Sequence, residues 1–198
     1  MHHLLAVCAA LVLYLTVPVS AGEETAATQE TETAAEETHE ARLDRLFGEL
    51  KRERNERAAK RISDRIWEEW SRSGSATIDL MMQWSQSAAD KKQFDVALDF
   101  LDQVTTLSPA FAEGWNRRAT VHFLMNNYAM SMADIDRTLQ LEPRHFGALS
   151  GMAQILKNTG RDQLALDAYL RVLDIYPMNR SAQTEVGSIS EEIVGEGI

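Results

Sequence analysis

The densest group of reactive side chains in the sequence lies in residues 115–123, which read WNRRATVHF. Two adjacent arginines, an asparagine, a tryptophan and a histidine fall within nine residues, a content typical of a catalytic or binding site. Helices bring together side chains three or four positions apart, not immediate neighbours. Whether these residues act as one site therefore depends on the elements that carry them.

Other motifs for chemistry are weak. Of the five histidines, only His122 and His145 fall in the part of the chain with globular composition, and neither has a paired cysteine or an HExxH context. Residues 147–151 read GALSG, which resembles a nucleophile elbow, but the spacing is wrong and a helix is expected there. The sequence contains no phosphate loop and no dinucleotide fingerprint. We therefore predict no enzyme activity, no catalytic residue, no metal site and no cofactor.

The composition favours an all-α protein. The chain has 198 residues, 44% of them hydrophobic and 25% charged, with only four prolines. That length allows one ordinary domain with tails. Residues that favour helices are common, and runs of β-branched residues are rare. The net charge of −10 argues against a general nucleic-acid binder, which usually carries a basic excess.

The N-terminus resembles an export signal. Residues 4–17 are apolar and uncharged, and Val19, Ser20 and Ala21 provide small residues suited to cleavage after Ala21. A run of about 14 residues is short for a membrane span, which needs roughly 20. We therefore predict a signal peptide over 1–21 and a periplasmic mature protein, with an uncleaved anchor in the inner membrane, facing the periplasm, as the alternative. Cleavage would remove Cys8, the single cysteine, and with it any thiol chemistry.

Residues 22–40 are expected to form an acidic linker. They carry seven Glu and no Lys or Arg, and they contain no large apolar side chain. Such a segment cannot bury enough surface to offset the entropy of the chain, so the composition predicts disorder and a tethering role.

The remaining sequence has a period of 34 residues. Pro109, Pro143 and Pro177 define three units, 78–111, 112–145 and 146–179. Two positions in each unit hold small residues, as expected where two helices approach closely. These are position 8, with Ser85, Ala119 and Ala153, and position 20, with Ala97, Ser131 and Ala165.

This pattern resembles the tetratricopeptide repeat (TPR) family over residues 78–179. The blocks IWEEWSRSGSATIDLMMQ, AEGWNRR and PRHFGAL are also similar to short exported TPR proteins of α-proteobacteria. The resemblance implies an all-α, TPR-type solenoid of helical hairpins. Gly160 fits the turn between two helices, and Ala97, Leu98, Leu101 and Val104 lie at helical spacing.

Both ends of a repeat stack need caps, because each unit leaves an apolar face for its neighbour. Residues 41–77 contain two amphipathic stretches and read either as N-terminal helices forming a degenerate repeat over 44–77 or as one long helix. In the repeat register, Ser63, Trp67 and Trp70 take core positions of a second helix. Residues 180–198 are expected to form a capping helix and tail. The basic residues over 52–65 alternate with acids, which favours a solvated helix face.

The resemblance also implies a concave groove that binds a protein or peptide. The side chains expected to face it come from positions 2, 5, 9, 12 and 13 of each first helix, with one arginine at the edge: Met82, Gln86, Asn116, Arg117, Thr120, Phe123, Ser150, Gln154 and Lys157. The lysine, asparagine and arginine set that clamps a carboxylate in some TPR proteins is not reproduced, since the first unit has Met82 and Gln86. We thus predict an adaptor that binds an envelope protein. The alternative is an oligomeric scaffold that uses Trp67, Trp70 and the outer helices.

The 34-residue period also assigns different roles to the residues of the stretch 115–123. Trp115 and Ala119 take core positions of a first helix, and His122 replaces a family aromatic and is expected to pack. Arg118 stands where the family prefers leucine, so it needs an acidic partner nearby. Only Asn116, Thr120 and Phe123, with Arg117 at their edge, remain as one wall of a groove.

Overall fold

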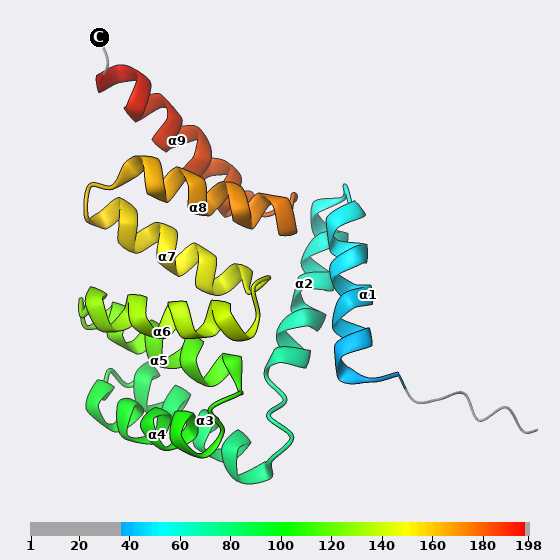
Figure 1. Ribbon diagram of the computed structural model, residues 1–198, viewed down its shortest axis with the longest axis vertical. Helices are drawn as coiled ribbons and strands as arrows, with labels where there is room; N and C mark the ends of the chain where they lie inside the picture. The colour runs from blue at the N-terminus through cyan, green and yellow to red at the C-terminus, as the bar shows by residue number, and fades with distance from the viewer. Residues whose placement is uncertain (1–36, 197–198) are drawn as a thin grey trace, which may run out of the picture. The chain divides into compact units, whose positions relative to one another are not determined.

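The computed structural model describes residues 37–196, in which nine α-helices and no strand occur (Figure 1). The all-α prediction is confirmed, while the proposed signal and residues 22–36 of the linker lie outside the described residues. No helix in the described range is long and apolar enough to cross a membrane. The helices are α1 (His39–Arg52), α2 (Glu56–Trp70), α3 (Ala76–Asp90), α4 (Phe94–Leu107), α5 (Ala112–Leu124), α6 (Tyr128–Leu141), α7 (Phe146–Asn158), α8 (Asp162–Ile175) and α9 (Arg180–Glu196).

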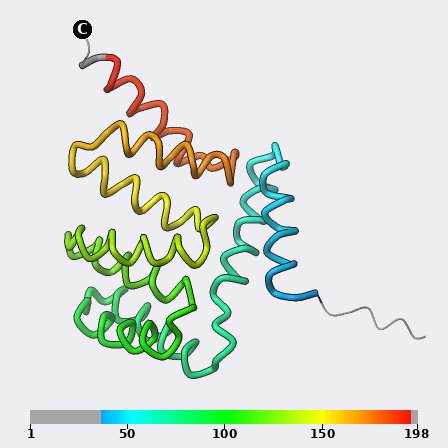
Figure 2. The backbone as a smooth tube through the Cα atoms, viewed as in Figure 1, coloured from blue at the N-terminus to red at the C-terminus, as the bar shows by residue number. Residues whose placement is uncertain are grey.

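Six of these helices form three hairpins, α3–α4, α5–α6 and α7–α8, which match the three sequence units and follow one another as a stack (Figure 2). All six small residues at positions 8 and 20 are buried. In the second hairpin the Ser131 hydroxyl donates to the Ala119 carbonyl at 2.8 Å, which shows how closely the two helices approach. The helical-hairpin solenoid expected from the sequence is therefore confirmed.

The turn inside each hairpin uses one left-handed residue at the same repeat position. These residues are Lys92, Asn126 and Gly160, with φ of 57°, 60° and 69°. Gly160 adopts this conformation without strain, asparagine tolerates it, and lysine does so at a cost. The prolines lie two residues beyond the ends of α4, α6 and α8, where no helix continues.

Residues 41–77 contain two helices, so the single long helix does not form. The break falls at residues 53–55, where the Glu53 carboxylate accepts from the backbone N–H of Arg54 and Asn55, both at 2.7 Å. The Asn55 side chain then caps α2 by accepting from the Ala58 backbone N–H at 3.0 Å.

The α1–α2 hairpin does not continue the stack as a fourth repeat before α3. Its buried side chains, which include Leu46, Phe47 and Trp70, belong to one cluster with apolar residues of α7, α8 and α9. Gly147 at the start of α7 permits this approach, because a Cβ there would lie 2.6 Å from Cη2 of Trp67. The small residue at the start of α7 therefore allows the hairpin to lie beside the third repeat. Trp67 and Trp70 pack against other side chains of the same chain.

The C-terminal helix α9 closes the other end of the stack. Ala182 and Ile189 are buried against the third repeat, and Val186 and Ile193 pack against the same cluster. The capping helix expected from the sequence is therefore confirmed.

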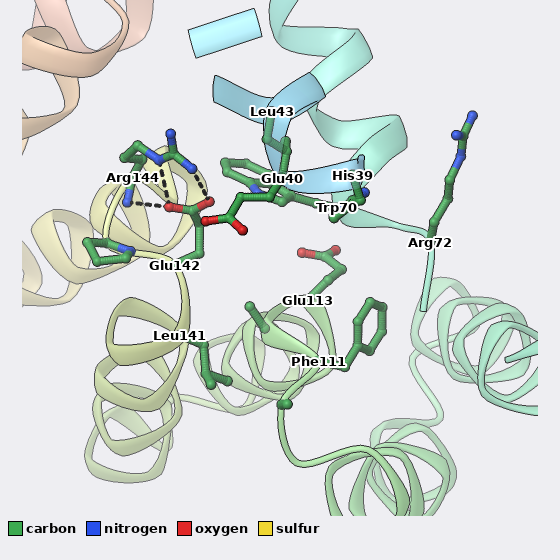
Figure 3. A pocket seen from close by; sticks show the side chains of 13 residues that line it. His39, Glu40, Leu43, Trp70, Arg72, Phe111, Glu113, Leu141, Glu142 and Arg144 are labelled. Carbon is green, nitrogen blue, oxygen red and sulfur yellow. Dashed lines mark hydrogen bonds and ion pairs between the residues drawn. The ribbon is translucent and has the colours of Figure 1, made fainter. Parts of the chain in front are cut away.

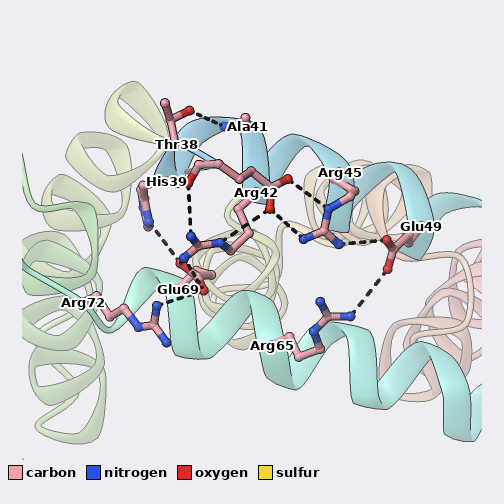
Figure 4. A network of polar contacts seen from close by, with 10 residues as sticks. Thr38, His39, Ala41, Arg42, Arg45, Glu49, Arg65, Glu69 and Arg72 are labelled. Atoms are coloured by element: carbon pink, nitrogen blue, oxygen red, sulfur yellow. Dashed lines mark hydrogen bonds and ion pairs between the residues drawn. The ribbon is translucent and has the colours of Figure 1, made fainter. Parts of the chain in front are cut away.

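Charges on the α1–α2 hairpin pair with each other (Figure 4). The buried Glu69 carboxylate lies 3.2 Å from guanidinium nitrogens of both Arg42 and Arg72. Glu49 connects the two helices, with contacts of 3.0 Å to Arg45 and 3.6 Å to Arg65. The more exposed ion pairs of Glu49 each contribute up to about 1 kcal/mol, so they orient the hairpin more than they stabilise it.

Candidate partner-binding groove

Five of the residues expected to face the groove line one hollow between the first helices of repeats two and three. They come from α5 and α7 and are Asn116, Thr120, Phe123, Ser150 and Gln154. The hollow measures about 280 Å³. Ligand pockets typically span about 300–1,000 Å³, so this one suits a side chain better than a whole small molecule.

The hollow exists because its walls and floor are built from small side chains. Gly147 and Gly151 come from α7 and Ala119 from α5, while Ile135 of α6 supplies the apolar floor. A Cβ at Gly151 would lie 3.5 Å from Cδ1 of Ile135, an ordinary contact. Some polar side chains that line the hollow already have hydrogen-bond partners within the chain. The Ser150 hydroxyl, for example, donates to the Phe146 carbonyl at 2.7 Å. The hollow is therefore mainly a site for an apolar group.

Three of the four remaining residues expected to face the groove, Met82, Gln86 and Arg117, line a second, more open hollow of about 670 Å³ over α3 and α5. Asp79, Asp90 and Lys91 make its rim charged. The Arg117 guanidinium contacts the Gln86 side chain, which joins the first helices of repeats one and two.

Lys157 lies outside both of these hollows. Its ammonium group donates to the Glu185 carboxylate of α9 at 2.8 Å. The position read as a groove contact therefore contributes to holding the C-terminal cap on the third repeat.

A buried carboxylate behind the groove was not anticipated from the sequence. Glu113 of α5 has no exposed side-chain surface, and it accepts hydrogen bonds from Asn116 and Arg117, both at 2.9 Å. It also lies 3.3 Å from Nε2 of His145. This arrangement positions two groove residues, because their donors are directed at one fixed anion. A Glu three and four residues before polar partners on a predicted helix is the only sequence signal for it.

His145 links this carboxylate to the α1–α2 hairpin. Its Nδ1 accepts from the Ala148 backbone N–H at 3.1 Å, so Nε2 carries the proton and donates to Glu113. The imidazole stacks on Trp70 at a centroid distance of 4.0 Å and meets Trp67 edge-on. Burial alone would raise the pKa of Glu113, but the hydrogen bond from His145 and the charge of Arg117 outweigh it and lower that pKa.

A further hollow of about 520 Å³ lies between the hairpin and the inter-repeat turns. Figure 3 shows the side chains that line it. Leu43 and Trp70 line it from α1 and α2, and Glu113 and Glu142 line it from the repeats. The Glu142 carboxylate is occupied by the Arg144 guanidinium at 2.9 Å. Among the residues that the structure describes, no cluster of His, Cys, Asp and Glu has the arrangement of a metal site.

The remaining members of the opening stretch have structural partners. Arg118 donates to both oxygens of Asp134, at 2.9 and 2.7 Å, and to Asp102 of the preceding repeat at 2.8 Å. Its guanidinium also lies 4.8 Å from the centre of the Trp115 ring. His122 is buried, as expected of a packing residue, and its Nε2 lies 4.0 Å from Oδ2 of Asp134. Arg118 therefore replaces an apolar packing residue with an ion pair between repeats.

Comparison with known proteins identifies the family. No family model matches the chain. A TPR repeat-containing protein of Rhizobium etli is 55% identical over 154 residues, which cover 78% of this chain and 76% of that protein. The chain belongs to the tetratricopeptide repeat family. The source of this relative fits the resemblance to α-proteobacterial TPR proteins.

More distant TPR proteins match part of the chain. The small glutamine-rich TPR-containing protein 2 of Saccharomyces cerevisiae is 27% identical over 97 residues, 49% of this chain and 28% of that protein. The first TPR domain of Spaghetti (RPAP3), solved with the HSP90 peptide SRMEEVD, has a TM-score of 0.58 at 20% identity and covers 61% of this chain and 95% of that one. The TPR2B domain of yeast Sti1, solved with an Hsp70 peptide, has a TM-score of 0.55 at 14% identity, covering 60% and 99%.

Proposed function

We propose that this TPR protein binds an extended segment of a protein partner along the groove formed by α3, α5 and α7. The observation that carries the proposal is the 280 Å³ hollow between α5 and α7, which five expected groove residues line. An apolar side chain of the partner would enter this hollow, and the polar groups around Gln86 and Arg117 would contact the partner backbone.

Two of the structural neighbours were solved with chaperone peptides, which supports a peptide as the ligand class. The present groove differs in chemistry from a carboxylate clamp, because Arg117 is occupied by Glu113 and the first repeat has Met82 and Gln86. We therefore propose an internal apolar segment, not a charged C-terminus, as the bound element.

A substitution that fills the hollow tests this proposal. Gly151→Leu places an isobutyl group in the space beside Ile135, and it should not destabilise α7, since leucine is a better helix former than glycine by up to about 1 kcal/mol. A photo-crosslinker at Thr120 should capture a partner in cells expressing the wild-type groove. That capture should fall at least about tenfold with Gly151→Leu, a change typical of an interface hot spot.

The matched control is Gly187→Leu in α9, where a Cβ would meet no atom within 4 Å. It makes the same substitution in a helix away from the groove, so capture at Thr120 should stay at the wild-type level. Equal capture by the wild type and Gly151→Leu, both with unchanged helical circular dichroism, would refute binding in this hollow.

We propose further that the partner is an envelope protein and that the chain acts without catalytic activity. Support for export comes from the apolar run over 4–17 and the small residues up to Ala21. Cell fractionation with mass spectrometry of the N-terminus tests the proposed export. A cytosolic protein that begins at Met1 would exclude export. Turnover of a hydrolase or transferase substrate by the pure protein would contradict the non-catalytic role.

A further inference from the structure

The first repeat has an uncovered apolar face at the start of the stack. Leu80 and Trp84 of α3 are 41% and 48% exposed, and Trp84 pairs with the half-buried Phe100 of α4 at a ring distance of 5.4 Å. We call these three side chains the end face. Large aromatic side chains that remain half exposed in a group often mark an interaction surface.

The repeat register shows what the end face points towards. Trp84 and Phe100 occupy the positions that Arg118 and Asp134 hold in the second repeat. There, Arg118 bonds to Asp134 and also reaches Asp102 of α4, the second helix of the preceding repeat. The end face is therefore directed to the place that a preceding repeat would occupy.

The position of Leu80 gives the same direction independently. Its equivalent in the second repeat is Gly114, where a Cβ would lie 2.7 Å from Cγ1 of Val104 in α4. This position is thus in close contact with the preceding repeat, and in the first repeat it holds a large apolar side chain.

Within residues 37–196 the elements that could cover the end face are used elsewhere. The core side chains of the α1–α2 hairpin are buried with α7, α8 and α9, and α9 closes the opposite end of the stack. The outward side of α9 is mainly polar, with exposed Gln183, Thr184 and Glu191, and its one large exposed apolar side chain in the described range is Val194 near the end of the helix. A second copy added head to tail would therefore cover Trp84 with polar groups.

We propose that the end face pairs with the same face of a second copy of this chain, in a twofold dimer. This contact places apolar side chains against apolar side chains and closes on itself, whereas a head-to-tail contact would continue into filaments. The inference is independent of the proposed groove function, since the groove lies on other faces of α3 and α5.

The size of the surface indicates the strength of the dimer. Two helices of 15 and 14 residues are about 22 Å long and together roughly 20 Å wide. Their outer side thus measures roughly 440 Å² per copy, about half of the 800 Å² per partner that is standard for specific association. We expect a weak dimer whose population rises with concentration.

Sedimentation velocity over a concentration series tests the dimer, with the protein as purified from cells and its N-terminus determined by mass spectrometry. The wild type should pass from monomer to dimer. Trp84→Glu should weaken the association by about tenfold or more, because a half-exposed aromatic at the centre of the contact is replaced by a charge. Leu164→Glu is the matched control: Leu164 of α8 is 52% exposed but lies away from the end face, so its dimer should be unchanged.

The proposal would be overturned by a monomer at every concentration, by a Trp84→Glu variant that associates like the wild type, or by equal weakening with Leu164→Glu. Growth to species larger than a dimer would also exclude the twofold contact. The circular dichroism of both variants should match the wild type, and Gly151→Leu should leave the dimer intact, which separates this test from that of the groove.

Discussion

Removing the Trp70 side chain should release the α1–α2 hairpin from the repeats. Trp70 is 6% exposed and contacts four aromatic rings: it stacks on His145 at 4.0 Å and packs on Phe146 at 5.0 Å, Trp67 at 5.2 Å and Phe47 at 5.7 Å. Truncating a buried tryptophan to alanine typically costs about 3–5 kcal/mol. Trp70→Ala should therefore destabilise the protein by about that amount.

One feature of Trp70 reduces its contribution and provides a control. Its buried Nε1 has no hydrogen-bond partner among the residues that the structure describes, and an unsatisfied buried donor costs about 1–3 kcal/mol. Trp70→Phe removes that donor while keeping an aromatic ring beside His145. Removing the unsatisfied donor offsets part of the stability that is lost with the smaller buried area. We therefore expect the free energy of unfolding of Trp70→Phe to lie within about 1.5 kcal/mol of the wild type.

Urea unfolding followed by circular dichroism measures both variants. The midpoint of Trp70→Ala should fall sharply or its transition should split, because the hairpin and the repeats would then unfold separately. A destabilisation below about 1 kcal/mol for Trp70→Ala would refute the docking role of Trp70. Equal losses for the alanine and phenylalanine variants would refute the argument about the aromatic stack.

Two further predictions concern the turns and the buried carboxylate. Lys92→Gly should stabilise the protein by about 1 kcal/mol in the same unfolding assay, because glycine adopts the φ of 57° without the strain that lysine bears; Gly160→Lys should destabilise it by a similar amount. Glu113→Gln should cost about 3 kcal/mol at neutral pH, since the amide offers one good acceptor to the three donors on Asn116, Arg117 and His145. The pKa of Glu113 is lowered in the folded state, so its contribution is present above the ordinary value near 4.5 and is lost as the pH falls through the depressed value. Thermal unfolding between pH 3 and 7 should therefore show a shallower acid loss for Glu113→Gln than for the wild type, and parallel curves would contradict this.

Much of the repeat region could be predicted from single residues. The prolines set the period, the small residues at positions 8 and 20 mark where helices approach, and Gly160 marks a turn. The groove residues were implied by the resemblance to TPR proteins, applied in the same register, and most of them lie together in the two hollows. These features are local or periodic, so their signal is present in the order of the residues.

Contacts between distant segments could not be read in this way. The amphipathic patterns of α1 and α2 indicated which sides would be buried but not what would cover them. The side of α7 that receives Trp67 depends on Gly147, eighty residues away in sequence, and the partners of Arg118 come from α4 and α6.

The sequence by itself thus determined a stack of helical hairpins, because a 34-residue period with small residues at fixed positions repeats the same local packing. Only the tertiary structure decided that the α1–α2 hairpin lies beside the third repeat and that Glu113 holds two groove residues. The physical reason is that these contacts depend on complementary shape and on charges brought together from segments that share no sequence period.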